Sequence, residues 1–178
     1  MAAYAVPAAL AWALLGLLLN FLPLSRAALL LAVVYCVFYG VPEALGRAGP
    51  APPGSRWQVP QRMVSGVSPR RRILVWGAVL GPGFATRNPY AGFGLLLLMV
   101  AALGSVTTGV AVAAAIGIAH GTGRALAVVR DSRQIGATEY LRTLLKSMYW
   151  RTFDGLALLV IGGVAASAYI STFWHVRL

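Results

Sequence analysis

The chain has 178 residues, of which 59% are hydrophobic and only 11% are charged. A soluble globular domain carries about 25% charged residues, and a chain of this length buries only about 70% of its surface when it folds. A large interior therefore cannot account for the missing charge. The composition excludes an ordinary soluble domain and predicts one all-α domain, a polytopic bundle of transmembrane helices.

The net charge is +11, from 15 Lys and Arg residues against 4 Asp and Glu residues. A nucleic-acid-binding surface is one interpretation of this balance. The cations lie between long apolar runs, which instead favours cytoplasmic loops that meet the anionic headgroups of a lipid bilayer. We therefore expect a multi-pass protein of the bacterial cytoplasmic (inner) membrane that binds no nucleic acid.

The first 41 residues are predicted to form a helical hairpin. Residues 2–19 and 27–41 are apolar, and a polar turn at 20–26 separates them. Each arm is close to the lower limit of about 17 residues for a membrane-crossing helix. No basic stretch precedes the first arm, so we expect a retained helix and not a cleaved signal peptide.

Residues 42–72 differ sharply in composition from the hairpin. They hold six of the ten prolines and six arginines, against one acidic residue, Glu43. Proline removes backbone hydrogen-bond donors and favours extended chain, so this segment is predicted to be an irregular cytoplasmic loop. A docking surface is the alternative.

The next part, 73–129, is predicted to contain one broken segment and two spans. The apolar run 73–86 is too short to cross comfortably, and Gly81, Pro82 and Gly83 interrupt it. The longer run 90–129 needs a turn, for which 104–109 is the natural place, giving helices at roughly 90–105 and 109–129.

The C-terminal part is predicted to contain a surface helix and a last span. Polar and apolar residues alternate at helical spacing in 130–152, as in an amphipathic helix that lies on the membrane. Residues 153–174 form the last span, and Phe173 and Trp174 mark its interfacial end.

The positive-inside rule separates two arrangements of these segments. If 73–88 enters and leaves the membrane by one face, the basic segments 42–72 and 130–152 both lie in the cytoplasm. This arrangement, five full spans and one re-entrant or broken segment, is the one we expect. Six full spans are the alternative.

Two groups of residues are candidate binding sites. Glycine and proline inside a membrane free backbone groups that must find partners or line a cavity, as in the broken helices of transporters. We therefore expect a gate or binding loop with Arg87 as an anion contact, and the alternative is a kinked helix whose Arg87 reaches the headgroups. The residues of this first group are Gly81, Pro82, Gly83, Arg87 and Asn88.

The second group is His120 with Arg124, four residues apart on one helix face. Ionisable groups within a membrane are costly and often functional, so His120 is a candidate proton relay or haem ligand. The only other histidine, His175, is expected near the opposite face, so no haem or other cofactor is predicted. The alternative is a buried histidine on a packing face, since Gly117 and Gly121 form a small-xxx-small pair, as do Gly77 and Gly81.

No catalytic or metal-binding set is expected. The four acidic residues, Glu43, Asp131, Glu139 and Asp154, are scattered along the chain without a close pair. Asp154 is predicted to form an interfacial ion pair with Arg151. The single cysteine, Cys36, excludes an intrachain disulfide.

The placement of glycine and proline from Trp57-Gln58-Val59-Pro60 through 76–89 to Gly92, Gly94 and Gly109 resembles one known group of proteins. The group comprises the membrane domains of cytochrome c biogenesis and thiol-disulfide electron carriers, including methylamine-utilisation relatives. The resemblance implies transfer of reducing equivalents through a cysteine next to proline in each of two helices. This chain has Gly81, Pro82 and Gly83 at the comparable positions, without a thiol.

These observations lead to a functional hypothesis with named alternatives. We expect a permease-like component, or a subunit or scaffold of a larger membrane complex, that associates with itself or with other membrane subunits. The alternative is a transmembrane redox carrier or haem-binding subunit, and a membrane-embedded enzyme is a third possibility.

Overall fold

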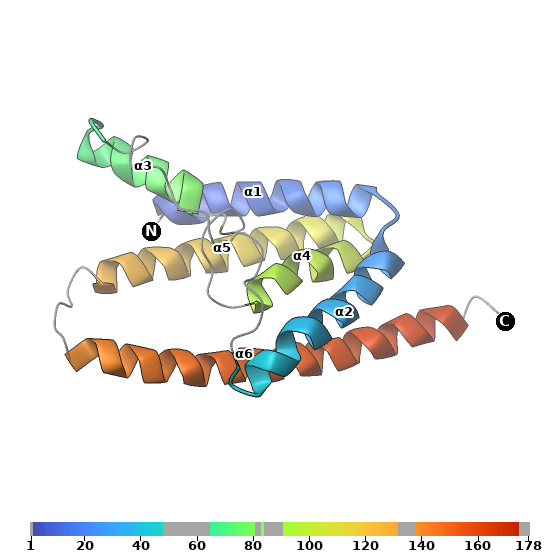
Figure 1. The fold of residues 1–178 in the computed structure, drawn as a ribbon. Helices are drawn as coiled ribbons and strands as arrows, with labels where there is room; N and C mark the ends of the chain where they lie inside the picture. The colour runs from blue at the N-terminus through green and yellow to red at the C-terminus, as the bar shows by residue number, and fades with distance from the viewer. Residues whose placement is uncertain (1, 48–64, 81–82, 84–90, 132–137, 175–178) are drawn as a thin grey trace. The chain divides into compact units, whose positions relative to one another are not determined.

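The computed structural model of the chain describes residues 2–47, 65–80, 83, 91–131 and 138–174. All regular structure in these residues is α-helical, which confirms the predicted all-α class, while the predicted number of spans stays a prediction. The helices form two compact units. Unit 1 contains α1 (Ala2–Phe21), α3 (Pro69–Leu80) and α5 (Val106–Asp131); unit 2 contains α2 (Ser25–Ala44), α4 (Gly92–Ala102) and α6 (Thr138–Trp174) (Figure 1).

Four helices are long and apolar enough to cross a membrane. They are α1, α2, the Val106–Ala127 part of α5 and the Tyr149–Ser171 part of α6. This finding supports a multi-pass membrane protein. The predicted span at 90–105 corresponds to α4, which is apolar but only 11 residues long. At a rise of about 1.5 Å per residue, α4 covers about half of a hydrocarbon core of about 30 Å.

Local chemistry explains where the helix bounds differ from the expected ones. Gly104 has a φ of 65°, a conformation that ends α4. The Ser105 hydroxyl then accepts a hydrogen bond from the backbone N–H of Thr108 at 3.4 Å, as an N-cap does. For this reason α5 begins at Val106 and not near residue 109.

Two other helices differ from the sequence-based segments. The short helix α3 begins at Pro69, a favourable residue for a first helical turn, and ends at Leu80, directly before the predicted break. The expected surface helix and last span have no boundary at 152–153, because α6 runs without interruption from Thr138 to Trp174.

In unit 1, α1 and α5 pack antiparallel with glycine at each close contact. A Cβ atom on Gly117 would lie 2.5 Å from the carbonyl oxygen of Ala8, and one on Gly121 would lie 2.6 Å from that of Tyr4. The predicted packing role of Gly117 and Gly121 is therefore confirmed. Gly77 of α3 likewise packs directly against the backbone of Ala3.

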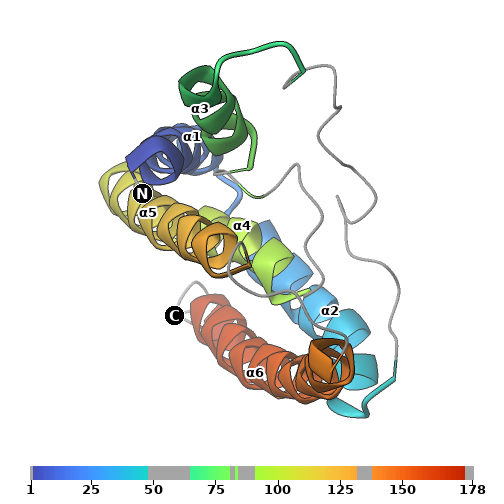
Figure 2. The ribbon, with the colours of Figure 1, turned by 90° about the vertical axis from the view of Figure 1, so that its left-hand side faces the viewer.

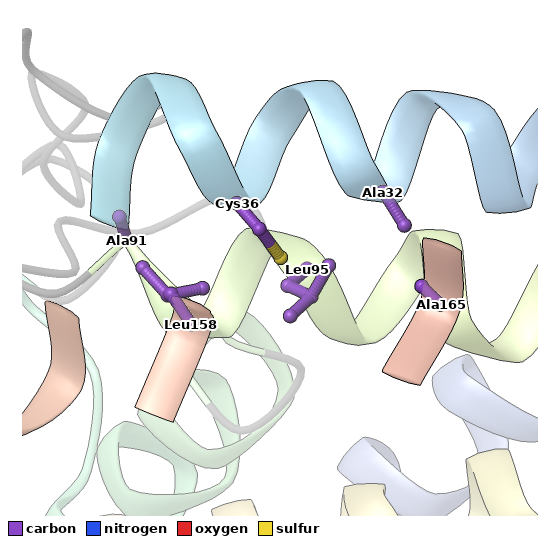
Figure 3. Packing of buried hydrophobic residues seen from close by; sticks show 6 residues of the cluster. All are labelled: Ala32, Cys36, Ala91, Leu95, Leu158 and Ala165. Atoms are coloured by element: carbon purple, nitrogen blue, oxygen red, sulfur yellow. The ribbon is translucent and has the colours of Figure 1, made fainter. Parts of the chain in front are cut away.

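In unit 2, α2 and α6 are also antiparallel and lie side by side (Figure 2). A Cβ atom on Gly162 would lie 2.7 Å from the Cβ atom of Cys36, and one on Gly40 would lie 3.1 Å from that of Leu158. Figure 3 shows the core that α2, α4 and α6 share. Its buried residues are Ala32, Cys36, Ala91, Leu95, Leu158 and Ala165.

Many buried residues of the long helices are small and many exposed ones are large, although Trp12 and Leu158 are also buried. On α1, Ala8 and Gly16 are buried, whereas Leu10 is 67% exposed; on α6, Gly162 and Ala165 are buried, whereas Val160 is 69% exposed. In a membrane, small residues let helices approach closely and large apolar side chains face lipid. Burial thus agrees with the apolar length of the four long helices.

Candidate functional site

The first group of predicted site residues lies almost wholly outside the described part of the chain. Gly81, Pro82, Arg87 and Asn88 fall there, and Gly83 alone is described. Gly83 has a φ of 82°, a conformation that only glycine adopts readily. A binding loop at these residues stays a prediction.

The second group, His120 and Arg124, lies on α5 in unit 1. Both residues are partly buried, and the Nε2 atom of His120 is inaccessible to solvent. The neighbouring Gly121 packs on α1, so His120 lies next to the closest contact of the two helices. This position agrees with a packing face and leaves the relay role of His120 a prediction; His175, the other candidate haem ligand, lies outside the described residues.

The structure brings together two acidic residues that the sequence analysis kept apart. Glu43, near the end of α2, and Asp154, in α6, are hydrogen-bonded through their side chains. The expectation of no close acidic pair was therefore wrong. The reason is the antiparallel contact of α2 with α6 at Gly155, where a Cβ atom would lie 2.7 Å from the carbonyl carbon of Glu43.

The Glu43 carboxyl group is removed from solvent. Glu43 is only 6% exposed, and its Oε2 atom has no hydrogen-bond partner among the residues that the structure describes. The backbone N–H of Ala91 donates a hydrogen bond to the same carboxyl group. A carboxyl group buried to this degree needs partners, and these come from α4 and α6.

Asp154 reaches the same end of α4 from the other side. Its Oδ2 atom accepts a hydrogen bond of 3.0 Å from the backbone N–H of Gly92. Ala91, the N-cap residue of α4, supplies no side-chain cap, so the two carboxyl groups cap this helix instead. The free N–H groups and the dipole of a helix N-terminus favour negative charge, which explains why both acids meet there.

Two glycines and a tyrosine complete the arrangement. Gly92 has no room for a Cβ atom, because Asp154 occupies that space, and Gly94 has none because of the Tyr35 hydroxyl. The Tyr35 hydroxyl donates a hydrogen bond of 2.7 Å to the carbonyl oxygen of Ala91. The N-terminus of α4 is therefore held by three side chains, two from α2 and one from α6.

This arrangement can hold a proton. Two carboxyl groups can hydrogen-bond to each other only when one of them carries a proton, and like charges in contact cannot both ionise readily. The Arg151 guanidinium of α6 adds a positive charge that acts on Glu43. In the described part of the chain, no three His, Cys, Asp or Glu residues gather as a metal site would require.

Sequence reasoning missed this pair although a signal existed. Glu43 and Asp154 are two of only four acidic residues, and each lies in a helix long and apolar enough to cross a membrane. A carboxyl group in such a helix is costly and is a candidate for function on that ground alone. What the sequence could not supply was the pairing of α2 with α6, and Asp154 was instead assigned to an ion pair with Arg151.

Comparison with known proteins adds no relative to this description. No family model, curated protein or solved structure matches the chain.

Proposed function

We propose that this protein is a permease-like component of a bacterial cytoplasmic membrane and that its working centre is the Glu43–Asp154 pair. The observation that supports this proposal best is a carboxyl pair, with Glu43 buried and Asp154 partly buried, where two long apolar helices meet the N-terminus of a short one. Ionisable groups in such positions mark ion and substrate pathways in membrane proteins.

The order of the helices supports a permease. The chain alternates between the units, and each unit consists of a long, a short and a long helix in that order. In each unit, the first helix packs along the third and also contacts the short one. Internal structural repeats and interrupted helices with their N-termini at a binding site are typical of transporters.

The Glu43–Asp154 contact also indicates which segments of the chain lie on the same side of the membrane. Because Glu43 contacts Asp154, the end of α2 lies beside the start of the apolar part of α6. The first residues of the basic segment 42–72 and the last residues of the basic segment 130–152 therefore lie at the same end of unit 2. This supports the arrangement in which both face the cytoplasm.

Cysteine labelling tests the sidedness. Single cysteines at Ser55 and Ser132, each in a Cys36→Ser background, should both resist an impermeant thiol reagent in intact cells and react after the cells are opened. Labelling of one position alone in intact cells would instead support six spans.

An assembly is the second part of the proposal. The four long helices bury mainly small residues and expose many large apolar ones, for instance Leu14, Phe38 and Val164. Such faces suit lipid or further membrane helices. We expect self-association or association with other membrane subunits, so native mass spectrometry of the protein extracted with its lipids should show a complex; an active monomer would contradict this expectation.

Transport itself can be measured on a solid-supported membrane that carries proteoliposomes. A panel of amino acids, sugars, organic acids and organic cations is applied in turn, and a transient current should follow at least one of them. Glu43→Gln should abolish this current. A wild-type protein that stays silent with every member of the panel would refute the permease and leave the role of a complex subunit.

A further inference from the structure

We infer that the Glu43–Asp154 pair is a proton-exchanging site, so that the ion used by the proposed permease is the proton. The inference rests on the proposed function for its biological role. The binding of the proton rests on the burial of Glu43, the packing of α2 on α6 at Gly155 and the hydrogen bond of Asp154 to the N-terminus of α4.

The donors around the pair favour a proton over a metal cation between the carboxyl groups. The two side chains are in direct hydrogen-bond contact, and the backbone N–H groups of Ala91 and Gly92 also point at their oxygen atoms. A metal ion such as Na⁺ or Ca²⁺ needs a shell of oxygen atoms, whereas N–H groups present positive hydrogen atoms to the site. One proton, by contrast, fits between two carboxyl oxygens.

The site has an acceptor without a hydrogen-bond partner among the described residues, and it lies near the end of α2. The Oε2 atom of Glu43 has no hydrogen-bond partner in the described part of the chain, although Glu43 is 94% buried. Glu43 is also the residue before the last of α2, at the end of an apolar stretch. A proton taken from water at this end converts one carboxylate of the pair into a carboxylic acid, and its return to water restores the carboxylate.

The charged and titratable groups around the pair come from two helices. The α2 helix contributes Tyr35, Cys36 and Tyr39, and α6 contributes Arg151 together with Asp154 itself. The α4 helix contributes only backbone N–H groups, since Gly92–Ala102 contains no ionisable residue. Glu43 and Asp154 are therefore the two carboxylic acids that meet at the N-terminus of α4.

Dicyclohexylcarbodiimide tests the inference without a known substrate. The reagent enters apolar sites and reacts with a carboxylic acid but not with a carboxylate. The acid proton moves to a reagent nitrogen, the carboxyl oxygen bonds to the central carbon, and an acyl shift leaves a stable N-acylurea. No group is lost, so the labelled peptide gains the whole mass of the reagent.

The experiment uses the full chain in lipid nanodiscs over a pH series, with peptide mapping by mass spectrometry. We expect the label on Glu43 or Asp154, and a labelling rate that falls about tenfold per pH unit once the pair begins to ionise. NaCl should not protect the site more than choline chloride at equal ionic strength. Glu43→Gln should abolish labelling at position 43, and Glu139→Gln, at another acidic residue, should leave it unchanged.

Three results would overturn the inference. Specific protection by Na⁺ would assign the pair to a metal cation. Labelling that stays constant across the pH series would mean a fixed, structural proton, and the absence of label in a folded protein at every pH would mean that the pair does not take up a proton at all. A positive result combined with a silent solute panel would keep the proton site and refute only the permease.

Discussion

The two units share one packing feature, a polar residue against a glycine, but the polar residue differs in chemistry. In each, the first long helix ends with a buried polar residue beside a glycine of the third helix: Asn20 beside Gly109 in unit 1, and Glu43 beside Gly155 in unit 2. The Asn20 side chain donates to the carbonyl oxygen of Gly16 in its own helix, at 3.0 Å. Glu43 instead bonds to groups on two other helices.

The difference shows where function is concentrated. The Asn20 amide is neutral and lies against Gly109 of α5, so it takes part in a helix contact without introducing charge. The Glu43 carboxyl group gains or loses charge and connects three helices. At this position, unit 1 therefore has a residue suited to helix packing, whereas unit 2 has a residue suited to function.

The largest expected effect comes from filling the close contact of unit 2. Gly155→Ala places a Cβ atom against the backbone of Glu43 and Ala44, and should lower the free energy of unfolding by about 1–3 kcal/mol. The matched control is Gly163→Ala, because a Cβ atom at Gly163 has nothing within 4 Å. Denaturation in mixed micelles measures both variants.

The same comparison can be made in unit 1 with Gly117→Ala and its control Gly123→Ala. A Cβ atom on Gly117 would lie 2.5 Å from the carbonyl oxygen of Ala8, whereas one on Gly123 meets nothing within 4 Å. If the units are equivalent in packing, Gly117→Ala and Gly155→Ala should destabilise the protein to a similar degree. Equal stabilities of Gly155→Ala and Gly163→Ala would contradict the contact of α2 with α6.

The next prediction distinguishes the contribution of Glu43 to helix packing from the contribution of its charge to transport. Glu43→Gln keeps a side chain that can donate a hydrogen bond to Asp154 but cannot release the proton. Solute-driven current should fall by at least about tenfold, while the free energy of unfolding changes by about 1 kcal/mol or less. Asn20→Ala, the corresponding change in unit 1, should cost about 0.6 kcal/mol and leave the current intact. If Glu43→Gln and Asn20→Ala reduce the current to the same degree, the proposed functional difference between the two units is wrong.

Apolar length and glycine spacing were enough to predict much of the fold. The runs at 2–19 and 27–41 gave α1 and α2 to within a few residues, because a helix in lipid is set by hydrophobic length. Gly117 and Gly121 predicted a close contact, because their spacing puts them on one helix face. The predicted break after residue 80 also agrees with the end of α3.

The carboxyl pair could not be predicted in the same way. Glu43 and Asp154 lie in distant parts of the sequence, and the expected hairpin of residues 1–41 in fact supplies α1 to one unit and α2 to the other. Their contact depends on the choice of α6 as the partner of α2. That choice follows from side-chain fit at Gly40, Gly155 and Gly162, which hydrophobicity alone does not encode.

The most local expected effect concerns the support of the pair, and it uses Tyr35. Tyr35→Phe removes the 2.7 Å hydrogen bond to the Ala91 carbonyl oxygen but keeps the ring beside Gly94. The loss should cost about 0.5–1.5 kcal/mol and act locally, so the backbone amides of Gly92 and Gly94 should exchange hydrogen faster. Hydrogen exchange with mass spectrometry measures this directly.

A neighbouring tyrosine supplies the control for this change. The Tyr39 ring lies with its centroid 4.5 Å from that of Tyr35, so Tyr39→Phe removes a hydroxyl group from the same aromatic pair. Exchange in α4 should remain at the wild-type rate in this variant. If Tyr35→Phe also leaves exchange unchanged, Glu43 and Asp154 alone hold the N-terminus of α4, and any change in their protonation would then act on this helix without a second restraint.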